Sequence, residues 1–218
     1  MDLTTVDQLL TTTRSVRRRL DLTRPVEEQL LKECLAIAIQ APSGSNRQGW
    51  HFMVVTDAEI RRVIANYYRQ AFKHYLVDNH QAELEPLRTR AGEGQADGNA
   101  TRILKSAIYL SQNLHKVPAF VIPCIEGRVE EAGPMAQASL YGSILPATWS
   151  LMLALRSRGL GSVWTTLHLA YEREIGALLG IPPTVTQAAL IPVAYYTGKD
   201  FRPAKRKPID QISHWNSW

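Results

Sequence analysis

Residues 132–155 read AGPMAQASLYGSILPATWSLMLAL and carry no charged side chain. The stretch is long enough to cross a bilayer as a helix, but it contains two glycines, two prolines and a glutamine, and no second such stretch accompanies it. A helix that is apolar on all sides is also typical of the buried centre of a large soluble domain. We therefore predict a core or interface helix here and no membrane partner.

Predicted strands and helices alternate on both sides of this segment. Apolar runs bounded by turn residues predict strands at 51–56, 119–125, 162–167 and 188–196. The spacing of apolar residues, with end signals such as Pro25 and Gly159, predicts helices. These helices are expected at 6–13, 25–41, from 57 onward, 101–116 and 172–180. Because no repeat or linker occurs, residues 1–218 are expected to form a single α+β or α/β domain.

A polar segment interrupts this alternation at 78–100. It has three glycines and no apolar periodicity, and long segments of this kind are often functional loops. The helix that precedes it carries several aromatic residues, among them Tyr68 and Phe72. We predict a lid or excursion over about 68–100, with Tyr68 and Phe72 facing a substrate.

Basic residues gather in two short clusters near the two ends of the chain. RSVRRRL (14–20) and RPAKRKP (202–208) each contain four cations. The chain has 25 Lys+Arg and 20 Asp+Glu, so that without these eight cations 17 basic residues would face 20 acidic ones. A nucleic-acid-binding protein usually presents a broad basic face, and no nucleic-acid partner is expected. Solvated surface charge remains the alternative for either cluster alone, whereas the pair favours a compact anion such as a phosphate.

Motifs for self-sufficient catalytic sites are missing from the sequence. The six histidines show no clustered metal spacing, and neither a Gly-x-Ser-x-Gly elbow nor a P-loop occurs. Cys34 and Cys124 lie far apart without Cys-x-x-Cys spacing, which fits a reducing cytoplasm, and the acidic start lacks the features of a signal peptide. We expect a cytoplasmic protein without a metal, whose chemistry comes from a bound cofactor.

Several stretches occur in an order that is typical of one protein family. TRSVRRRL (13–20), APSGSNRQGWHF (41–52) and LRSRGLGSVWTT (155–166) are followed by LLGIP, ALIPVAY and RPAKRKP. Together they resemble the signatures of the nitroreductase family of FMN flavoproteins over nearly the whole chain. Thr13 and Gly49 stand where the family commonly has arginine and proline.

The resemblance implies an α+β fold with a central, mainly antiparallel sheet flanked by helices, in an intertwined homodimer. It implies two FMN sites at the subunit interface, each built from both chains. The C-terminal tail at 199–218 is expected to lie on the partner subunit. The two basic clusters would then be the two halves of one FMN site.

The resemblance also assigns expected roles within the basic clusters. Arg14, Ser15 and Arg17 are expected to contact FMN, with Arg17 at the N1/O2 edge of the flavin, where negative charge develops on reduction. Arg206, together with Lys205, is expected to hold the phosphate. An arginine fork suits a phosphate better than the point charge of a lysine does.

Two further groups are expected near the flavin ring. They are the loop residues Ser43, Gly44 and Asn46, which line the ring or come from the partner subunit, and Thr165 and Thr166, which lie near the pyrimidine edge and N5. By contrast, Arg18 and Arg19 are interpreted as surface charges, and His168 as a structural histidine.

The implied activity is that of an FMN-dependent oxidoreductase. Hydride from NADH or NADPH would pass through flavin N5 to an electron-poor small molecule, such as a nitroaromatic or a quinone, in a ping-pong exchange. One alternative is a dehalogenase-like flavoenzyme that uses one-electron steps, with the hydroxyl of Thr166 near N5. Another is a flavin-binding or storage protein that turns over no nicotinamide.

Overall fold

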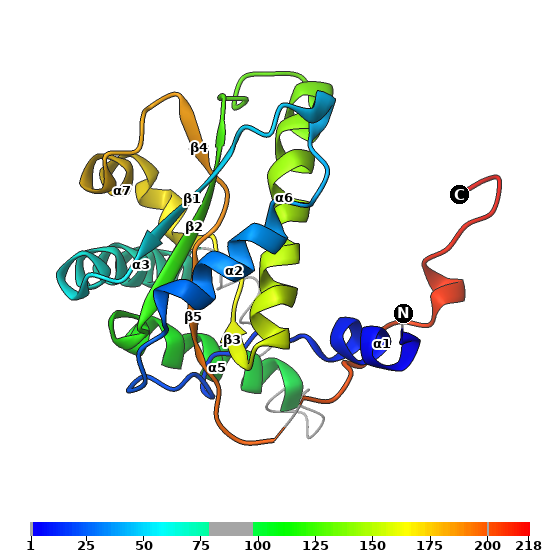
Figure 1. Ribbon diagram of the computed structural model, residues 1–218, viewed down its shortest axis with the longest axis horizontal. Coiled ribbons are helices and arrows are strands. Elements are labelled where there is room, and N and C mark those ends of the chain that lie inside the picture. Colours follow the sequence, from blue (N-terminus) through cyan, green and yellow to red (C-terminus); the bar gives the residue numbers. More distant parts are fainter. Residues whose placement is uncertain (1, 79–97, 200) are drawn as a thin grey trace.

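The computed structural model describes residues 2–78, 98–199 and 201–218 and shows an α+β fold (Figure 1). Strands form a sheet in the order β1-β2-β5-β3, with β4 paired to β2, and each of these pairings is antiparallel. The strands are β1 Trp50–Val55, β2 Ala119–Glu126, β3 Leu160–Ser162, β4 Val185–Gln187 and β5 Ile191–Tyr195. The prediction of a mainly antiparallel sheet flanked by helices is confirmed.

Helices cover both faces of this sheet, and the central strand β2 shows how. Its side chains alternate between the faces, so that Ala119 and Val121 pack with α2 and α6, whereas Phe120 and Ile122 pack with α3, α5 and α7. All four side chains are fully buried. The helices are α1 Leu3–Thr12, α2 Glu28–Ala38, α3 Ala58–Asp78, α5 Gly98–Asn113, α6 Pro134–Ser157 and α7 Glu172–Leu179.

The uncharged segment forms α6, the longest helix of the described residues. Ile144, Ala147, Leu151 and Leu155 lie on one face of α6 and are fully buried. Leu151 and Leu155 pack with α2 and the sheet. Length and composition alone would let α6 cross a membrane. However, its contacts with α2, β2 and β3 are those of a core helix, as the sequence predicted.

The predicted strand at 162–167 is wrong in position. Gly159, with φ of +77°, ends the preceding helical turn and lets β3 begin at Leu160. Beyond Ser162 the chain leaves the sheet, and Thr165 makes only an isolated bridge to Leu190 before a 3-10 helix at Leu167–Tyr171. β4 was missed because three residues are too few to show the period of a strand.

The predicted lid overlaps a regular helix. α3 continues to Asp78, so 68–78 is helical, and α5 begins at Gly98. Tyr68 and Phe72 are 4% and 5% exposed, which places them within the protein rather than on a surface lid. The rest of the predicted lid, 79–97, lies outside the described residues.

Candidate functional site

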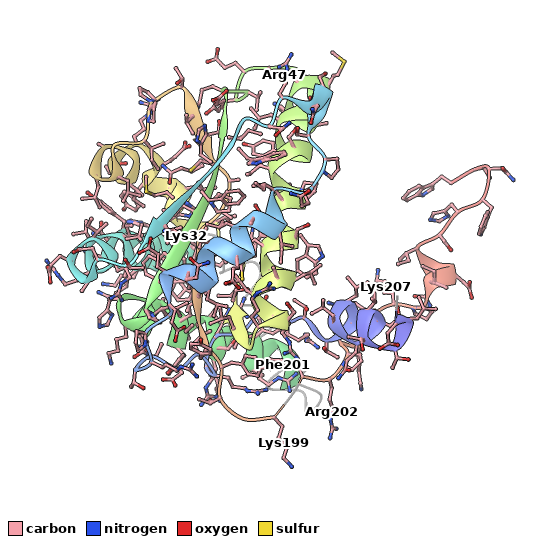
Figure 2. The ribbon with its side chains drawn as sticks, viewed as in Figure 1. Lys32, Arg47, Lys199, Phe201, Arg202 and Lys207 are labelled. Carbon is pink, nitrogen blue, oxygen red and sulfur yellow. The ribbon has the colours of Figure 1, made fainter. Side chains whose placement is uncertain are left out.

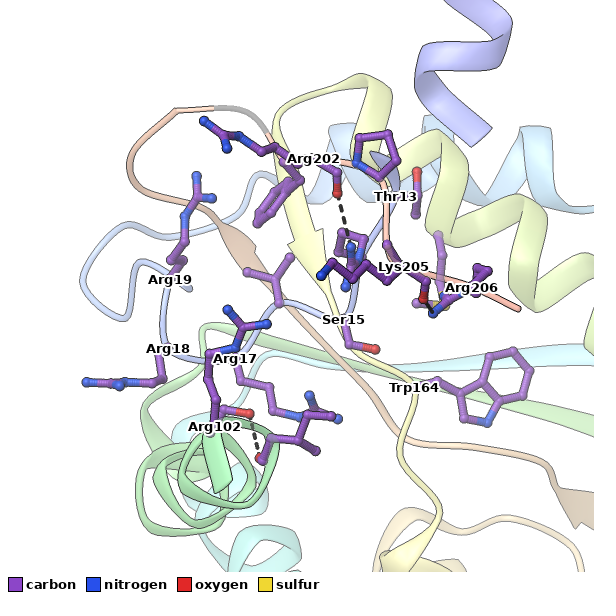
Figure 3. A pocket seen from close by; sticks show the side chains of 18 of the residues that line it. Thr13, Ser15, Arg17, Arg18, Arg19, Arg102, Trp164, Arg202, Lys205 and Arg206 are labelled. Carbon is purple, nitrogen blue, oxygen red and sulfur yellow. Dashed lines mark hydrogen bonds between the residues drawn. The ribbon is translucent and has the colours of Figure 1, made fainter. Parts of the chain in front are cut away.

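Both basic clusters line one pocket of about 1300 Å³ beside β3 (Figure 3). Figure 2 labels Phe201 and Arg202, two lining residues at the start of the C-terminal tail. Lining residues come from the N-terminal segment, α5, α6, the segment after β3 and the C-terminal tail. No aspartate or glutamate is among the lining residues within the described part of the chain. The lining cations are Arg14, Arg17, Arg18, Arg19, Arg102, Arg202, Lys205 and Arg206.

The N-terminal cluster is held against the sheet by its backbone. Val16 N–H donates to the carbonyl of Ser162 at 2.9 Å, and Thr197 N–H donates to the carbonyl of Arg19 at 2.8 Å. Val16 and Leu20 are buried in the core. Since these two apolar anchors flank the arginines at 17–19, the segment presents those arginines on the outer side of the sheet, at the pocket (Figure 3).

Close packing at Gly161 permits this placement. A Cβ atom on Gly161 would lie 3.1 Å from the Val16 side chain and 3.2 Å from Leu20 Cδ2. Both neighbours are buried in the core, so moving either of them would disturb its packing. The absence of a side chain at Gly161 therefore lets the segment that carries the arginines at 17–19 cross β3.

Gly161→Ala is expected to lower the free energy of unfolding by about 1–3 kcal/mol, because overpacking displaces Val16 and Leu20. Urea denaturation of the variant would measure this loss. Gly142→Ala is the control, since its added methyl meets no atom within 4 Å on the exposed side of α6, and we expect no loss of stability there because alanine is the better helix former. Equal stability of both variants would contradict the crossing described above.

Arg17 lies half-buried beside the buried Tyr68. Burial lowers the pKa of the Arg17 guanidinium, whereas the nearby Tyr68 raises it. Burial raises the pKa of Tyr68 to about 12, and Arg17 and a hydrogen bond with Thr165 oppose that rise. The Tyr68 hydroxyl therefore stays protonated at neutral pH and packs beside a fixed cation rather than on a lid.

The two predicted threonines are not pocket-lining residues. Thr165 is buried, and its Oγ1 donates to the carbonyl of Leu190 at 2.8 Å. Thr166 is exposed at the start of the 3-10 helix. Trp164, directly before them, does line the pocket. Within this subunit Thr165 supports the site through Tyr68, and the expected contacts of both threonines with a flavin stay predictions.

The loop with Ser43, Gly44 and Asn46 lies elsewhere in the subunit. It contains the short helix Gly44–Asn46, beside the N-terminal half of α6 (Figure 1). The N–H of Gly44 donates to Ser143 Oγ at 2.9 Å. None of the three loop residues lines the pocket, which touches α6 only at Trp149 and Met152. A role of this loop at the site of the partner subunit stays a prediction.

The C-terminal tail crosses the pocket and then leaves the body of the subunit (Figure 1). Arg14 Nη1 donates to the carbonyl of Arg202 at 3.0 Å. Lys205 and Arg206 are exposed at the pocket, and Arg206 Nη1 donates to the carbonyl of Lys205 at 3.5 Å. The end of the tail is fully open, with Trp218 101% exposed and stacked on His214.

Sequence reasoning missed the contribution of α5, whose Arg102, Ile103 and Ser106 line the pocket. The one available signal was the position of Arg102 near the start of the helix, where a cation is unfavourable to the helix dipole.

Sequence reasoning also missed the role of Arg19, which is half-buried and donates to the backbone rather than being a surface charge. Arg18 is exposed as expected. His168 is fully buried and does not line the pocket, but neither ring nitrogen has a hydrogen-bond partner among the described residues, so it is not a hydrogen-bonded core histidine, and its structural role stays a prediction.

Comparison with known proteins identifies the family. The model for the "Nitroreductase family" matches residues 10–195. The chain belongs to the nitroreductase family. That match includes the N-terminal cluster and the sheet of this nitroreductase-family protein but ends before the C-terminal cluster. The position of the C-terminal cluster therefore comes from the structure itself.

Relatives of this family member carry several names. A NADH dehydrogenase of Thermus thermophilus is 29% identical over 217 residues, covering 93% of this chain and 91% of that protein. An iodotyrosine deiodinase of Thermotoga neapolitana is 27% identical over 186 residues, covering 84% of each. The FMN-dependent nitroreductase NfnB of Mycobacterium smegmatis, solved in complex with NADPH, has a TM-score of 0.70 and 21% identity, covering 99% of this chain and 100% of that chain. The last similarity supports the fold.

Proposed function

We propose that this protein binds FMN in the cationic pocket and catalyses NAD(P)H-dependent reduction of an electron-poor acceptor, such as a nitroaromatic or a quinone. The observation that carries the proposal is the convergence of two distant basic clusters on one pocket whose described lining has no acidic residue. Such a site suits a phosphate ester, because arginine forks match phosphate oxygens and the charges are complementary. The names of the family relatives support the same chemistry.

The pocket residues have two proposed roles, phosphate binding and contact with the flavin ring. The cations of the tail, with Arg14 opposite them, would hold the phosphate. Arg17 is set deeper, beside the protonated hydroxyl of Tyr68. A preorganised cation of this kind stabilises negative charge without reorganisation, so Arg17 would face the ring system of the flavin. The side chain of Trp164, which also lines the pocket, would offer that ring system an apolar surface.

FMN held by these residues would supply the redox chemistry, namely transfer of a hydride equivalent from a reduced nicotinamide to the electron-poor acceptor. Both small molecules would use the same open side of the pocket in turn, giving the ping-pong exchange. The chain itself binds, orients and provides fixed charge.

A homodimer is part of the proposal. Tyr141, Leu145 and Trp149 recur at four-residue spacing on α6 and are 37–41% exposed, which is typical of an apolar helix face that packs on a partner. The tail extends beyond the body of its own subunit (Figure 1). A second copy would cover both features and bring the loop containing Ser43 toward the pocket of the other subunit.

Reductive dehalogenation is the second candidate, favoured by the similarity to iodotyrosine deiodinase. Assays with NAD(P)H and either a nitroaromatic or a halogenated phenol would separate the two activities. A flavin-storage protein would reduce neither substrate.

The test begins with the visible spectrum of freshly purified protein and identification of the chromophore that heat denaturation releases. Flavin bands, released FMN and rapid anaerobic bleaching by NADH or NADPH are the expected results. Bound FMN that neither nicotinamide bleaches would indicate storage. A colourless protein that fails to take up added FMN would overturn the proposal.

Arg206→Ala is expected to weaken FMN binding about 10- to 100-fold, because one charge-assisted hydrogen bond contributes roughly 1.5–3 kcal/mol. Fluorescence titration of the apoprotein with FMN would measure the change. Lys207→Ala is the matched control, since Lys207 neighbours Arg206 in the same exposed tail but does not line the pocket. Unchanged affinity in Arg206→Ala would remove this residue from the phosphate site.

A further inference from the structure

Two arginines enclose a pair of aromatic rings where the C-terminal tail begins. The rings of Tyr196 and Phe201 lie 5.0 Å apart between centroids. Arg19 Cζ lies 4.1 Å from the ring centroid of Phe201 and 5.4 Å from that of Tyr196. Arg156 Cζ lies 5.2 Å and 5.1 Å from the same centroids, and Arg156 Nη1 donates to the Tyr196 hydroxyl at 2.6 Å.

Arg19 also binds the backbone of the turn between these rings. Its Nε donates to the carbonyl of Thr197 at 2.6 Å, and its Nη2 donates to the carbonyl of Lys199. Gly198, at φ of +81°, brings the turn close, since an added Cβ would lie 3.4 Å from Arg19 Nη2. One face of this guanidinium thus lies against the ring of Phe201, and two of its nitrogens, Nε and Nη2, donate to the backbone. Arg19 differs in this respect from the exposed Arg18 beside it.

We propose that Arg19 and Phe201 are positioning residues that fix the C-terminal cations over the pocket. Phe201 directly precedes Arg202, and an extended chain advances at most about 3.6 Å per residue, so an anchored Phe201 keeps Lys205 and Arg206 within reach of the N-terminal cluster. The hydrogen bond from Arg14 to the carbonyl of Arg202 holds the following residue in the same way. The inference rests on the proposed function where it takes the phosphate of FMN as the ligand of these cations.

Arg19 and Phe201 both line the pocket, and anchoring of the tail would raise affinity in addition to any contact that they make with the ligand. A free tail must be ordered when the ligand binds, and that entropic cost weakens binding, whereas a tail that is already fixed avoids it. This gain in affinity should appear only for a ligand that carries a phosphate. Riboflavin has the ring system and ribityl chain of FMN but no phosphate, so it reports on the rest of the pocket.

Phe201→Leu removes the ring but keeps an apolar side chain of similar size. We expect it to raise the Kd of FMN about 10-fold, as loss of a desolvated cation–π contact and of preorganisation allows, and to leave the Kd of riboflavin within about 2-fold. Phe201→Tyr keeps the ring and should restore FMN binding. Equal weakening of both flavins would show a merely structural role and overturn the proposal, as would unchanged FMN affinity.

Arg19→Lys keeps the charge but removes the planar guanidinium that lies on the ring of Phe201 and donates to the two carbonyls of Thr197 and Lys199. Its effect on FMN binding should match that of Phe201→Leu. The double variant should bind FMN no more than about 2-fold more weakly than either single variant, because both substitutions remove the same contact between Arg19 and Phe201. Arg24→Lys is the matched control, since Arg24 stacks on the neighbouring ring of Tyr195 at 3.3 Å but does not line the pocket. A strong effect of Arg24→Lys, or additive effects of the pair, would overturn the assignment.

Tryptic cleavage of the apoprotein tests the anchor without any flavin. Cleavage after Lys205 and Arg206 should be about 5-fold faster in Phe201→Leu and Arg19→Lys than in the wild type and in Arg24→Lys, because local opening controls proteolysis. Unchanged cleavage overturns the anchor. If cleavage accelerates while wild-type protein binds neither flavin, the anchor stands and the proposed FMN function fails.

Discussion

Between pH 6.5 and about 3, His168 is expected to make the free energy of unfolding fall by about 1.4 kcal/mol for each unit of acidification. Burial lowers the pKa of the His168 imidazole to about 3 in the folded protein, from 6.5 in an accessible histidine. The side chain is fully buried, and neither ring nitrogen has a hydrogen-bond partner among the described residues. Within this window the unfolded chain binds a proton that the folded protein does not. Acid therefore favours unfolding, and above pH 6.5 the effect disappears.

His168→Phe isolates this contribution, because an apolar ring in the same position does not titrate. Urea denaturation of both proteins from pH 8 to pH 4 would give the difference in their free energies of unfolding. That difference should be constant above pH 7 and should then shift in favour of the variant by about 1.4 kcal/mol per unit below pH 6. All other titrating groups are common to both proteins. Parallel pH profiles would show that His168 is protonated or solvated in the folded state.

Arg14→Ala is expected to weaken FMN binding by about 100-fold or more, a larger effect than that of Arg206→Ala. Arg14 lines the pocket, and its Nη1 also donates to the carbonyl of Arg202. The substitution therefore removes a pocket cation and also releases the backbone of the tail that carries Lys205 and Arg206. Fluorescence titration of the apoprotein with FMN and with riboflavin would measure the loss and its dependence on the phosphate.

Arg18→Ala is the matched control for Arg14, because it removes the same charge from the same cluster. Arg18 also lines the pocket, but its side chain is exposed, and no hydrogen bond or ion pair joins it to another described residue. We expect a change in FMN affinity below about 3-fold, the size of a screened surface charge. In the double variant Arg14→Ala/Arg206→Ala, the effects should be less than additive, because the first change already displaces Arg206. Similar losses in Arg14→Ala and Arg18→Ala would mean that net charge, rather than tail placement, governs binding.

Local patterns predicted the helices well. The predicted helix at 172–180 is observed as α7, Glu172–Leu179, ended by Gly180 at φ of +66°. The uncharged stretch forms α6 with a shift of only two residues at each end. In both segments the apolar spacing and the end signals agree with the burial that tertiary packing requires. β3 and β4 were not predicted correctly, because three-residue strands are defined by their partners rather than by their own sequence.

The sequence by itself determined the α+β class, the core helix, the two cation clusters and the resemblance to the nitroreductase family. These properties depend on the order and spacing of residues along the chain. Only the tertiary structure decided that Tyr68 lies beside Arg17, that Arg102 joins the pocket, and that Arg19 holds the tail instead of facing solvent. Each of these contacts joins residues distant in the chain, and Arg18 and Arg19 are identical in sequence terms. Their roles differ because the backbone, fixed by the buried Val16 and Leu20, turns one guanidinium outward and the other onto Phe201.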